Sequence, residues 1–292
     1  MFKDKLEAFY NKYYKVLMLI PIILLVISFI IVGSRFASTG ELFNRDVTLK
    51  GGITMTIYTD QEISTELLQN KIPVDSIVKK LTDFSTGKQV GVIVEASDIK
   101  EEELKPILQK ELNIELTNEN YSIEETGSSL GASFYTELIW AVIFAFILMA
   151  IAIFILFRTF TPSIAVVFSA LIDIMVPLAI INIFNIKVSS AGIVAFLLLI
   201  GYSVDTDILL TTRSIKRTNG RLFDRMYASM KTGLTMTFCA IAVMITGLVI
   251  SNTPIIKEMF FIILLGLITD IFSTYLTNAG ILTMYCKKKN IT

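Results

Sequence analysis

Apolar residues along this chain gather into six runs of roughly 16 to 27 residues, separated by polar segments. A helix needs about 20 consecutive, mostly apolar residues to cross the hydrocarbon core of a bilayer. We therefore predict a polytopic α-helical membrane protein with six spans, and the 53% share of hydrophobic residues excludes a soluble globular protein. The predicted spans are 16–32, 138–157, 163–184, 188–210, 235–250 and 259–285.

One polar segment, residues 34–133, is far longer than the others and lies between the first two spans. Alternating branched and polar positions predict strands at 51–59, 89–94, 114–117 and 121–125. Helical spacing of apolar residues predicts helices at 73–84 and 97–112. This order is typical of an α+β domain of the ferredoxin-like, split β-α-β kind.

Basic residues predict the sidedness of the spans. Lysines precede the first span and follow the last, and residues 213–231 between the fourth and fifth spans hold six basic residues against one acid. Positive charge marks the cytoplasmic side of a membrane protein, so we expect both termini in the cytoplasm. The predicted units are 1–33 (cytoplasmic N-terminus and first span), 34–133 (extracytoplasmic domain) and 134–292 (five-span bundle with a cytoplasmic C-terminus).

Four carboxylates lie inside the predicted spans. Asp173 is in the third span, Asp205 and Asp207 are in the fourth, and Asp270 is in the sixth. A carboxylate at the bilayer centre costs roughly 2.5–3.5 kcal/mol on insertion scales, so it needs a partner, a water-lined cavity or a proton. Helical geometry turns Asp205 and Asp207 about 200° apart, so these two acids cannot face the same neighbour.

Three interpretations of these acids are open. In the first, they are structural and are satisfied by hydroxyl groups, by Arg213 or by backbone groups. In the second, they relay protons in a crevice that also includes the face bearing Thr237. In the third, two facing aspartates form an intramembrane protease, but residues 201–205 lack the Gly-x-Gly-Asp pattern of such enzymes.

Small and hydroxyl-bearing residues in two spans predict close helix packing. In membranes such faces let helices approach each other and form hydrogen bonds across the contact. The residues of this packing motif are Gly201, Tyr202 and Ser203 in the fourth span and Gly266, Ser273 and Thr274 in the sixth.

The composition excludes several kinds of chemistry. The chain has no histidine, which removes imidazole metal sites and Ser-His catalysis. Its two cysteines, Cys239 and Cys286, are far apart and lack metal-ligand spacing, and no glycine-rich phosphate loop is present. We expect no catalysis, no cofactor, no metal ion and no bound nucleic acid.

Four segments carry a resemblance to a known family. They are 49–52 (Leu-Lys-Gly-Gly), 126–131 before the second span, 200–213 around Gly-Tyr-Ser and the acidic pair, and 266–275 in the last span. Together with the span pattern they resemble the SecF family of protein-export membrane proteins, in the SecD/SecF branch of the RND superfamily. The Val-Asp-Thr-Asp sequence at 204–207 is similar to the archaeal branch of that family.

The resemblance implies a location in the plasma membrane, pairing with SecD as two halves of one architecture, and action beside a SecYEG-type translocon. It also implies surrounding membrane lipid, contact of the outer domain with the translocating polypeptide and, in bacterial members, coupling to proton flow. The bacterial pattern places its aspartate at Thr206 and has an arginine at Met236, so transfer of the proton mechanism to single residues is open.

We therefore predict a non-enzymatic accessory subunit of Sec protein export. Two alternatives are open: an RND-type half-transporter for lipid or small molecules, and a passive assembly factor without ion flux. The 17 acidic and 10 basic residues of 34–133 give a net charge of −7, which indicates either a solvated surface or a patch for a basic partner.

Overall fold

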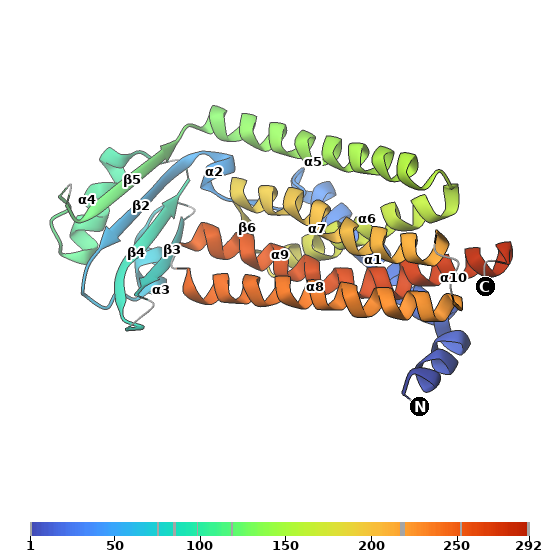
Figure 1. Ribbon diagram of the computed structural model, residues 1–292. Coiled ribbons are helices and arrows are strands. Elements are labelled where there is room, and N and C mark those ends of the chain that lie inside the picture. Colours follow the sequence, from blue (N-terminus) through green and yellow to red (C-terminus); the bar gives the residue numbers. More distant parts are fainter. Residues whose placement is uncertain are drawn as a thin grey trace.

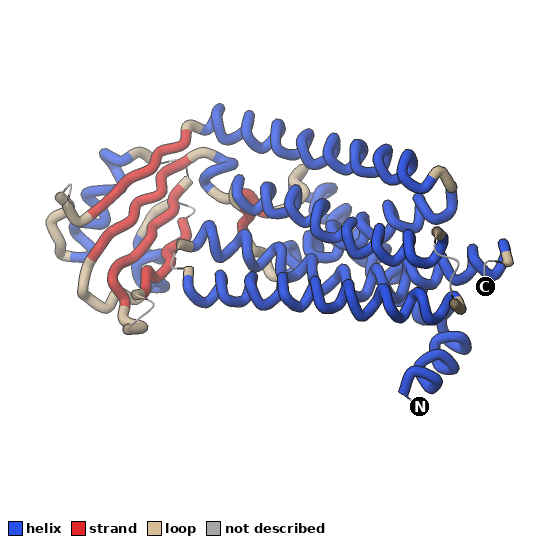
Figure 2. Tube along the Cα trace, in the orientation of Figure 1, coloured by secondary structure: helices blue, strands red, loops and turns tan. Residues whose placement is uncertain are grey.

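The computed structural model describes residues 2–74, 76–83, 86–97, 99–117, 119–216, 220–251 and 253–290. An α+β domain lies at one end of a long bundle of helices, and both ends of the chain lie at the opposite end of the bundle (Figure 1). Apart from one short two-stranded ladder beside the bundle, the strands belong to the domain (Figure 2). The domain therefore projects from one end of a helical body, as expected for an insert after the first span.

Five helices of the described residues are long and apolar enough to cross a membrane, namely α1, α5, α6, α7 and α8. The last predicted span is built from three consecutive elements, of which α9 carries Lys257, Glu258 and Asp270. The bounds are α1 Phe2–Thr39, α5 Ser128–Phe157, α6 Phe160–Ile183, α7 Ser190–Ile215, α8 Leu222–Ile250, α9 Pro254–Phe272, the π-helix η1 Ser273–Asn278 and α10 Ala279–Lys289.

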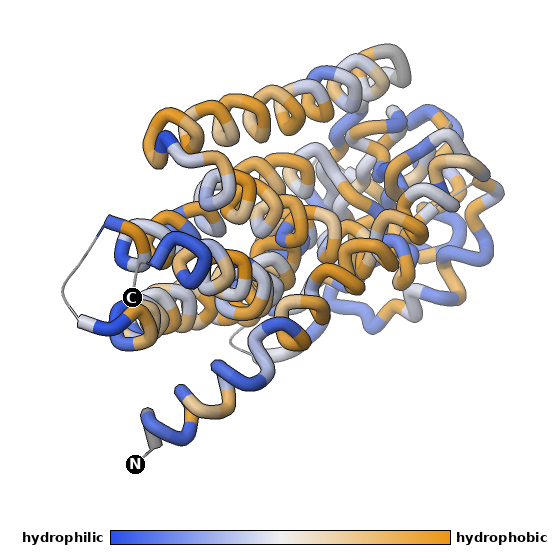
Figure 3. The backbone as a smooth tube through the Cα atoms, turned by 90° about the vertical axis from the view of Figure 1, so that its right-hand side faces the viewer, coloured by the Kyte–Doolittle hydropathy of each residue, from blue (hydrophilic) through white to orange (hydrophobic). Residues whose placement is uncertain are grey.

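Helices α6 and α7 form the centre of the bundle and bury more than half of their apolar windows, whereas α1, α5 and α8 bury far less. Hydrophobic residues predominate along the bundle helices, whereas the stretch of α1 next to the N-terminus is largely hydrophilic (Figure 3). Apolar side chains such as Leu148 and Ile155 of α5 remain exposed, which suits a surface that faces lipid rather than water. The core of the bundle includes Ile181, Leu199 and Ile262, each at most 1% exposed.

The domain contains a four-stranded sheet with the order β3-β4-β2-β5, in which all neighbouring strands are antiparallel. Strand β2 turns alternate residues, including Ile53 and Ile57, toward a core that also contains Leu104 and Leu108 of α4. The elements are β2 Gly52–Tyr58, α3 Thr65–Lys71, β3 Ser76–Thr82, β4 Gln89–Ala96, α4 Glu101–Leu112 and β5 Tyr121–Thr126.

The predicted helix at 73–84 is wrong, because Ser76–Thr82 forms β3. Residue 84 of that stretch, and residue 98 of the other predicted helix, lie outside the described residues. The branched pair Ile77 and Val78 fits a helical stripe equally well, but pairing with β4 along seven positions decides for a strand. The short strand predicted at 114–117 is also absent, since these residues form an irregular segment. Helix α3 was not predicted, because only Leu68 of its seven residues is buried and the apolar spacing is weak.

A short connector fixes the domain to the bundle. Strand β1 (Asn44–Arg45) pairs in parallel with β6 (Lys187–Val188), and helix α2 (Val47–Lys50) follows directly. The side-chain amide of Asn182 on α6 donates to the Leu42 carbonyl at 2.9 Å. The connector is therefore held to the bundle just before β1, at Leu42, and at β1 itself, through its pairing with β6.

Two of the segments that carry the family resemblance meet beside this connector. A Cβ at Gly131 would lie 2.8 Å from the backbone nitrogen of Gly51, so the start of α5 contacts the backbone at the end of α2 directly. Gly51 has φ 88°, a left-handed conformation that glycine adopts without strain. Gly51 and Gly131 therefore lie at the same close contact between the end of α2 and the start of α5, although they are far apart in the sequence.

Glu95, near the end of β4, is a buried carboxylate with 4% exposure. Its Oε1 lies 2.6 Å from Nζ of Lys79, and the Asp46 carboxylate also lies against it. Burial, followed by the neighbouring charge of Asp46, raises the pKa of Glu95 to about 7. The folded domain therefore binds a proton that the unfolded chain, with its ordinary glutamate, releases near pH 4.5.

We expect this proton to make the stability of the chain depend on pH. The Glu95 contribution is fully present below about pH 4.5 and is lost as the pH rises through about 7, a difference on the order of 3 kcal/mol. Thermal unfolding of the detergent-solubilised chain between pH 4.5 and 8 measures it. Glu95→Gln should flatten the profile and Glu124→Gln, at an exposed position of β5, should not; equal slopes in the two variants would contradict the assignment.

Candidate functional site

Three of the four intramembrane acids converge in the centre of the bundle. Asp173 of α6, Asp207 of α7 and Asp270 of α9 each place a carboxylate oxygen within 4.8 Å of the other two. Each side chain is at most 1% exposed. We call these three residues the aspartate cluster.

Hydroxyl groups from two helices hold Asp173. Ser203 of α7 donates to its Oδ2, and Ser273 at the start of η1 donates to its Oδ1 at 2.5 Å. Each oxygen of Asp173 therefore has a hydroxyl donor from a different helix. Ser203 and Ser273 belong to the predicted packing motif, and both are buried.

The other two acids share a second set of donors. The Thr206 hydroxyl lies 2.9 and 3.0 Å from the two oxygens of Asp270. The Thr274 hydroxyl lies 2.9 Å from Oδ1 of both Asp207 and Asp270, and it can donate to only one of them at a time. The amide of Asn278 donates to Oδ1 of Asp207 at 2.7 Å.

The π-helix η1 brings these donors to the cluster. It begins directly after α9 and contains Ser273, Thr274 and Asn278, all fully buried. A π-helix widens the turn, and single π-turns inside α-helices are frequent at functional sites. The wider turn directs residues from both ends of η1 toward α6 and α7.

No basic side chain among the described residues neutralises the carboxylates of the aspartate cluster. Among the residues that the structure describes, no ion pair joins it to a lysine or arginine, and Oδ2 of Asp207 has no hydrogen-bond partner. Three carboxylates in contact cannot all be charged in a dry interior unless a proton or a cation lies between them. A dry cluster of these three acids therefore needs at least one bound proton or a cation.

The cluster oxygens are also the ligand type that hard cations prefer. Most of them already accept hydrogen bonds from hydroxyl or amide donors, so a cation at the cluster would have to displace or share these oxygens. The expectation of no metal ion stays a prediction.

The other sequence-derived site residues lie outside the cluster. Asp205 is exposed on the outer face of α7, which confirms that it and Asp207 face different neighbours. The guanidinium of Arg213 donates to the Ala228 carbonyl at 2.8 Å and to Thr232, not to an aspartate. Thr237 is buried, and its hydroxyl donates to the Gly233 carbonyl of its own helix.

The packing glycines have different surroundings. A Cβ at Gly266 would lie 2.2 Å from side-chain carbons of Leu199, so α7 and α9 are in close contact there, as the motif predicts. Gly201 has nothing within 4 Å of such a Cβ, and Tyr202 is 47% exposed. Close packing against this chain therefore applies to Gly266 and not to Gly201.

Sequence reasoning missed two contributors, Asn278 and the donor role of Thr206. An amide inside an apolar run is a recognisable signal, because side-chain amides in membranes form hydrogen bonds between helices. Thr206 stands between the two acids, at the position where the bacterial pattern has its aspartate, but no pattern in the sequence indicates that its hydroxyl contacts Asp270. Its role depends on the approach of α9.

Comparison with known proteins places this arrangement in a family. A family model described as protein export membrane protein SecD/SecF, C-terminal, matches residues 108–288. The protein-export membrane protein SecF of Methanocaldococcus jannaschii is 35% identical over 280 residues, covering 94% of this chain and 96% of that protein. The protein of the same name from Pyrococcus furiosus is 33% identical over 291 residues, covering 98% and 96%.

Solved structures show the same fold. The crystal structure of SecDF from Thermus thermophilus, described as a translocon-associated membrane protein, matches with a TM-score of 0.70 at 14% identity. This chain is covered to 96% and spans 38% of that longer chain. A structure of SecDF in a super-membrane-facing form matches with a TM-score of 0.62 at 16% identity over 95% of this chain and 39% of that one.

Proposed function

This chain belongs to the SecD/SecF family of protein-export membrane proteins, and from that premise we propose that it is a non-enzymatic accessory subunit of Sec protein export. The single observation that carries the proposal is its similarity, over almost the whole length, to relatives named protein-export membrane protein SecF. The chain has the fold of only part of SecDF, which supports action together with a SecD-type partner beside a SecYEG-type translocon.

The architecture in the membrane extends this proposal. Elements α9, η1 and α10 run without a break from Pro254 to Lys289 and serve as the sixth span, in addition to the five apolar helices. The lysines at 287–289 then lie in the cytoplasm together with the N-terminus. The domain lies outside, and its β-α-β-β-α-β order supports the ferredoxin-like class.

The exposed face of α7 is the surface that we assign to the SecD-type partner. Asp205 lies there about 15 Å from the end of the helix at Ile215, at a rise of roughly 1.5 Å per residue. Within the described part of the chain it has no hydrogen-bond or ion-pair partner, and a carboxylate facing lipid is costly. Gly201 offers room for close approach of a second helix, and the partner then supplies a donor for Asp205.

Adding bulk at Gly201 should therefore weaken association without unfolding the chain. For Gly201→Leu we expect about a tenfold loss of the SecD-type subunit recovered by affinity purification, equivalent to about 1.4 kcal/mol. Ala152→Leu, which adds the same kind of bulk on the exposed surface of α5, is the matched control. If both variants recover the same amount of the SecD-type subunit, the exposed face of α7 is not the surface that binds it.

The aspartate cluster supports a proton-coupled role within this assembly. Its buried carboxylates, the unpartnered oxygen of Asp207 and the absence of a counter-ion among the described residues fit a group that exchanges protons. The passive assembly factor is the competing function, and the Asp207 experiment below separates the two. Two hollows in the described part of the domain are lined by charged and polar residues such as Glu111 and Glu125, which does not favour a transporter of apolar molecules.

The export function itself is tested by affinity purification from native membranes. The tagged chain should recover a SecD-type subunit and translocon subunits at levels well above those obtained with an unrelated tagged membrane protein. Recovery of neither would overturn the proposal.

A further inference from the structure

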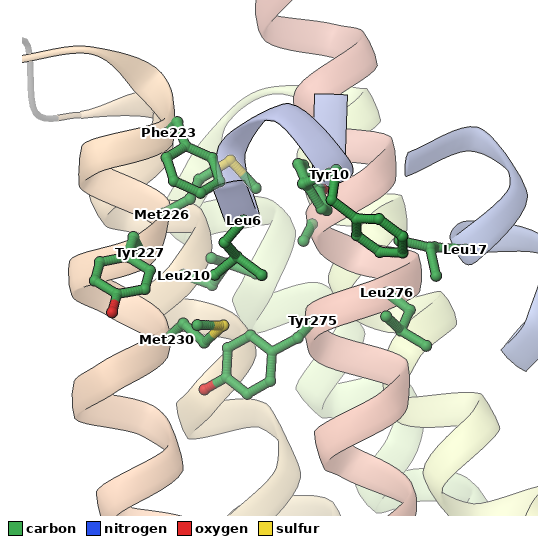
Figure 4. A pocket seen from close by; sticks show the side chains of 12 residues that line it. Leu6, Tyr10, Leu17, Leu210, Phe223, Met226, Tyr227, Met230, Tyr275 and Leu276 are labelled. Atoms are coloured by element: carbon green, nitrogen blue, oxygen red, sulfur yellow. The ribbon is translucent and has the colours of Figure 1, made fainter. Parts of the chain in front are cut away.

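An apolar pocket lies toward the end of the bundle where the chain termini lie, between α1, α8 and the η1–α10 helix (Figure 4). Its volume is about 230 Å³, and nearly all of its lining is carbon. Ring and sulfur-containing side chains from α8, among them Phe223 and Met226, face Leu6 and Tyr10 of α1 across it. The pocket is below the 300–1,000 Å³ of a typical small-molecule site, and it suits a section of one hydrocarbon chain.

A second hollow adjoins this pocket and shares Tyr10, Phe223 and Met226 with it; most of its lining is carbon, with several charged or polar side chains. Its other lining residues include Arg221 at the start of α8 and Lys287 near the end of α10. Arg221 contacts Glu7 at 3.3 Å and Asp224 at 3.1 Å. The ammonium of Lys287 lies 3.3 Å from Oδ1 of Asn11.

The basic residues around the hollow can contact an anion. Its lining carries Arg221, Lys287 and one acid, Glu7, and a second acid, Asp224, pairs with Arg221. Arg221 has five N–H donors in a planar fork that matches phosphate geometry, so its two acidic neighbours do not use all of its donors. Three consecutive lysines, at 287–289, end α10 at this side.

We propose that the pocket and the hollow together bind one anionic phospholipid of the cytoplasmic leaflet. Its phosphate contacts Arg221 and Lys287, and the adjoining acyl chain enters the apolar pocket between α1 and α8. Basic pockets between transmembrane helices on the cytoplasmic side are where anionic head groups bind. The choice of leaflet rests on the proposed cytoplasmic position of the termini, whereas the site itself follows from the shape and charge of this crevice and does not depend on the export function.

Tryptophan quenching by brominated lipid tests the proposal. The chain has a single tryptophan, Trp140, which is 53% exposed on α5 and reports on ordinary lipid contact. In the Trp140→Phe background, Phe223→Trp places the only tryptophan in the pocket. Full-length protein is reconstituted in bilayers of phosphatidylcholine with increasing brominated phosphatidylglycerol, and in parallel with brominated phosphatidylcholine.

In the Phe223→Trp variant we expect brominated phosphatidylglycerol to quench at least fivefold more effectively per mole than brominated phosphatidylcholine, since each nearby Lys or Arg contributes roughly fivefold. The wild-type reporter Trp140 should show a ratio near one. Leu6→Trp in the same background is a second pocket reporter if Phe223→Trp does not fold.

Charge variants complete the test. Arg221→Gln with Lys287→Gln should bring the quenching ratio at the pocket reporter to near one, whereas Arg158→Gln with Lys216→Gln, two exposed positions that line neither the pocket nor the hollow, should leave it unchanged. Equal quenching by both lipids at the pocket reporter would overturn the site as specific for anionic lipid. Absence of quenching by either lipid would show that protein side chains close the pocket, and it would overturn the proposal as well.

Discussion

Asp207→Asn is expected to reduce the proton-dependent part of export at least tenfold while the chain remains folded. Asparagine has the shape of aspartate, and its oxygen can still accept from Thr274 and Asn278. It cannot bind or release a proton, however, and it removes one like charge from the aspartate cluster. We therefore expect an unfolding temperature equal to or above that of the wild type.

The measurement is export of a reporter protein into membrane vesicles with and without an imposed proton gradient. Asp205→Asn is the informative comparison, because Asp205 is exposed on the opposite side of the same helix. We expect it to affect recovery of the SecD-type subunit more than the gradient response. Unchanged export of Asp207→Asn under the gradient would favour the passive assembly factor.

Gly266→Val is expected to destabilise the chain by about 1–3 kcal/mol, the usual cost of forcing extra carbons into a packed core. The first added carbon would lie 2.2 Å from side-chain carbons of Leu199, which is itself fully buried, and protein interiors are packed too densely for such a side chain to move aside without cost. Separation of α7 from α9 also moves Asp270, one turn along α9, away from Thr206.

Thermal unfolding of the detergent-solubilised chain checks this expectation. Gly201→Val is the matched control, because a Cβ added there meets, among the described residues, nothing within 4 Å beyond the nearby backbone of its own helix. We expect a fall of several degrees for Gly266→Val and little change for Gly201→Val. Equal unfolding temperatures would contradict the close contact between α7 and α9.

The domain shows where local patterns are insufficient. Strands β2, β4 and β5 follow from alternation in the sequence, and α4 follows from its apolar stripe. The stretch 76–82 fits a helix or a strand by spacing alone, and only pairing with β4, which lies outside that stretch, makes it β3. Whether such a stretch forms a strand depends on the neighbouring strand with which it pairs and not on its own residue spacing.

The sequence by itself determined the apolar helices, the position of the inserted domain and the family, because hydropathy and motif composition are local properties that each segment carries alone. The tertiary structure decided which acids meet. Asp207 joins Asp173 and Asp270, whereas Asp205 faces outward, since the rotation of α7 is set by packing against α6 and α9. The donors from η1 reach the aspartate cluster because the helical turn is widened there, and no pattern of residue spacing predicts that widening.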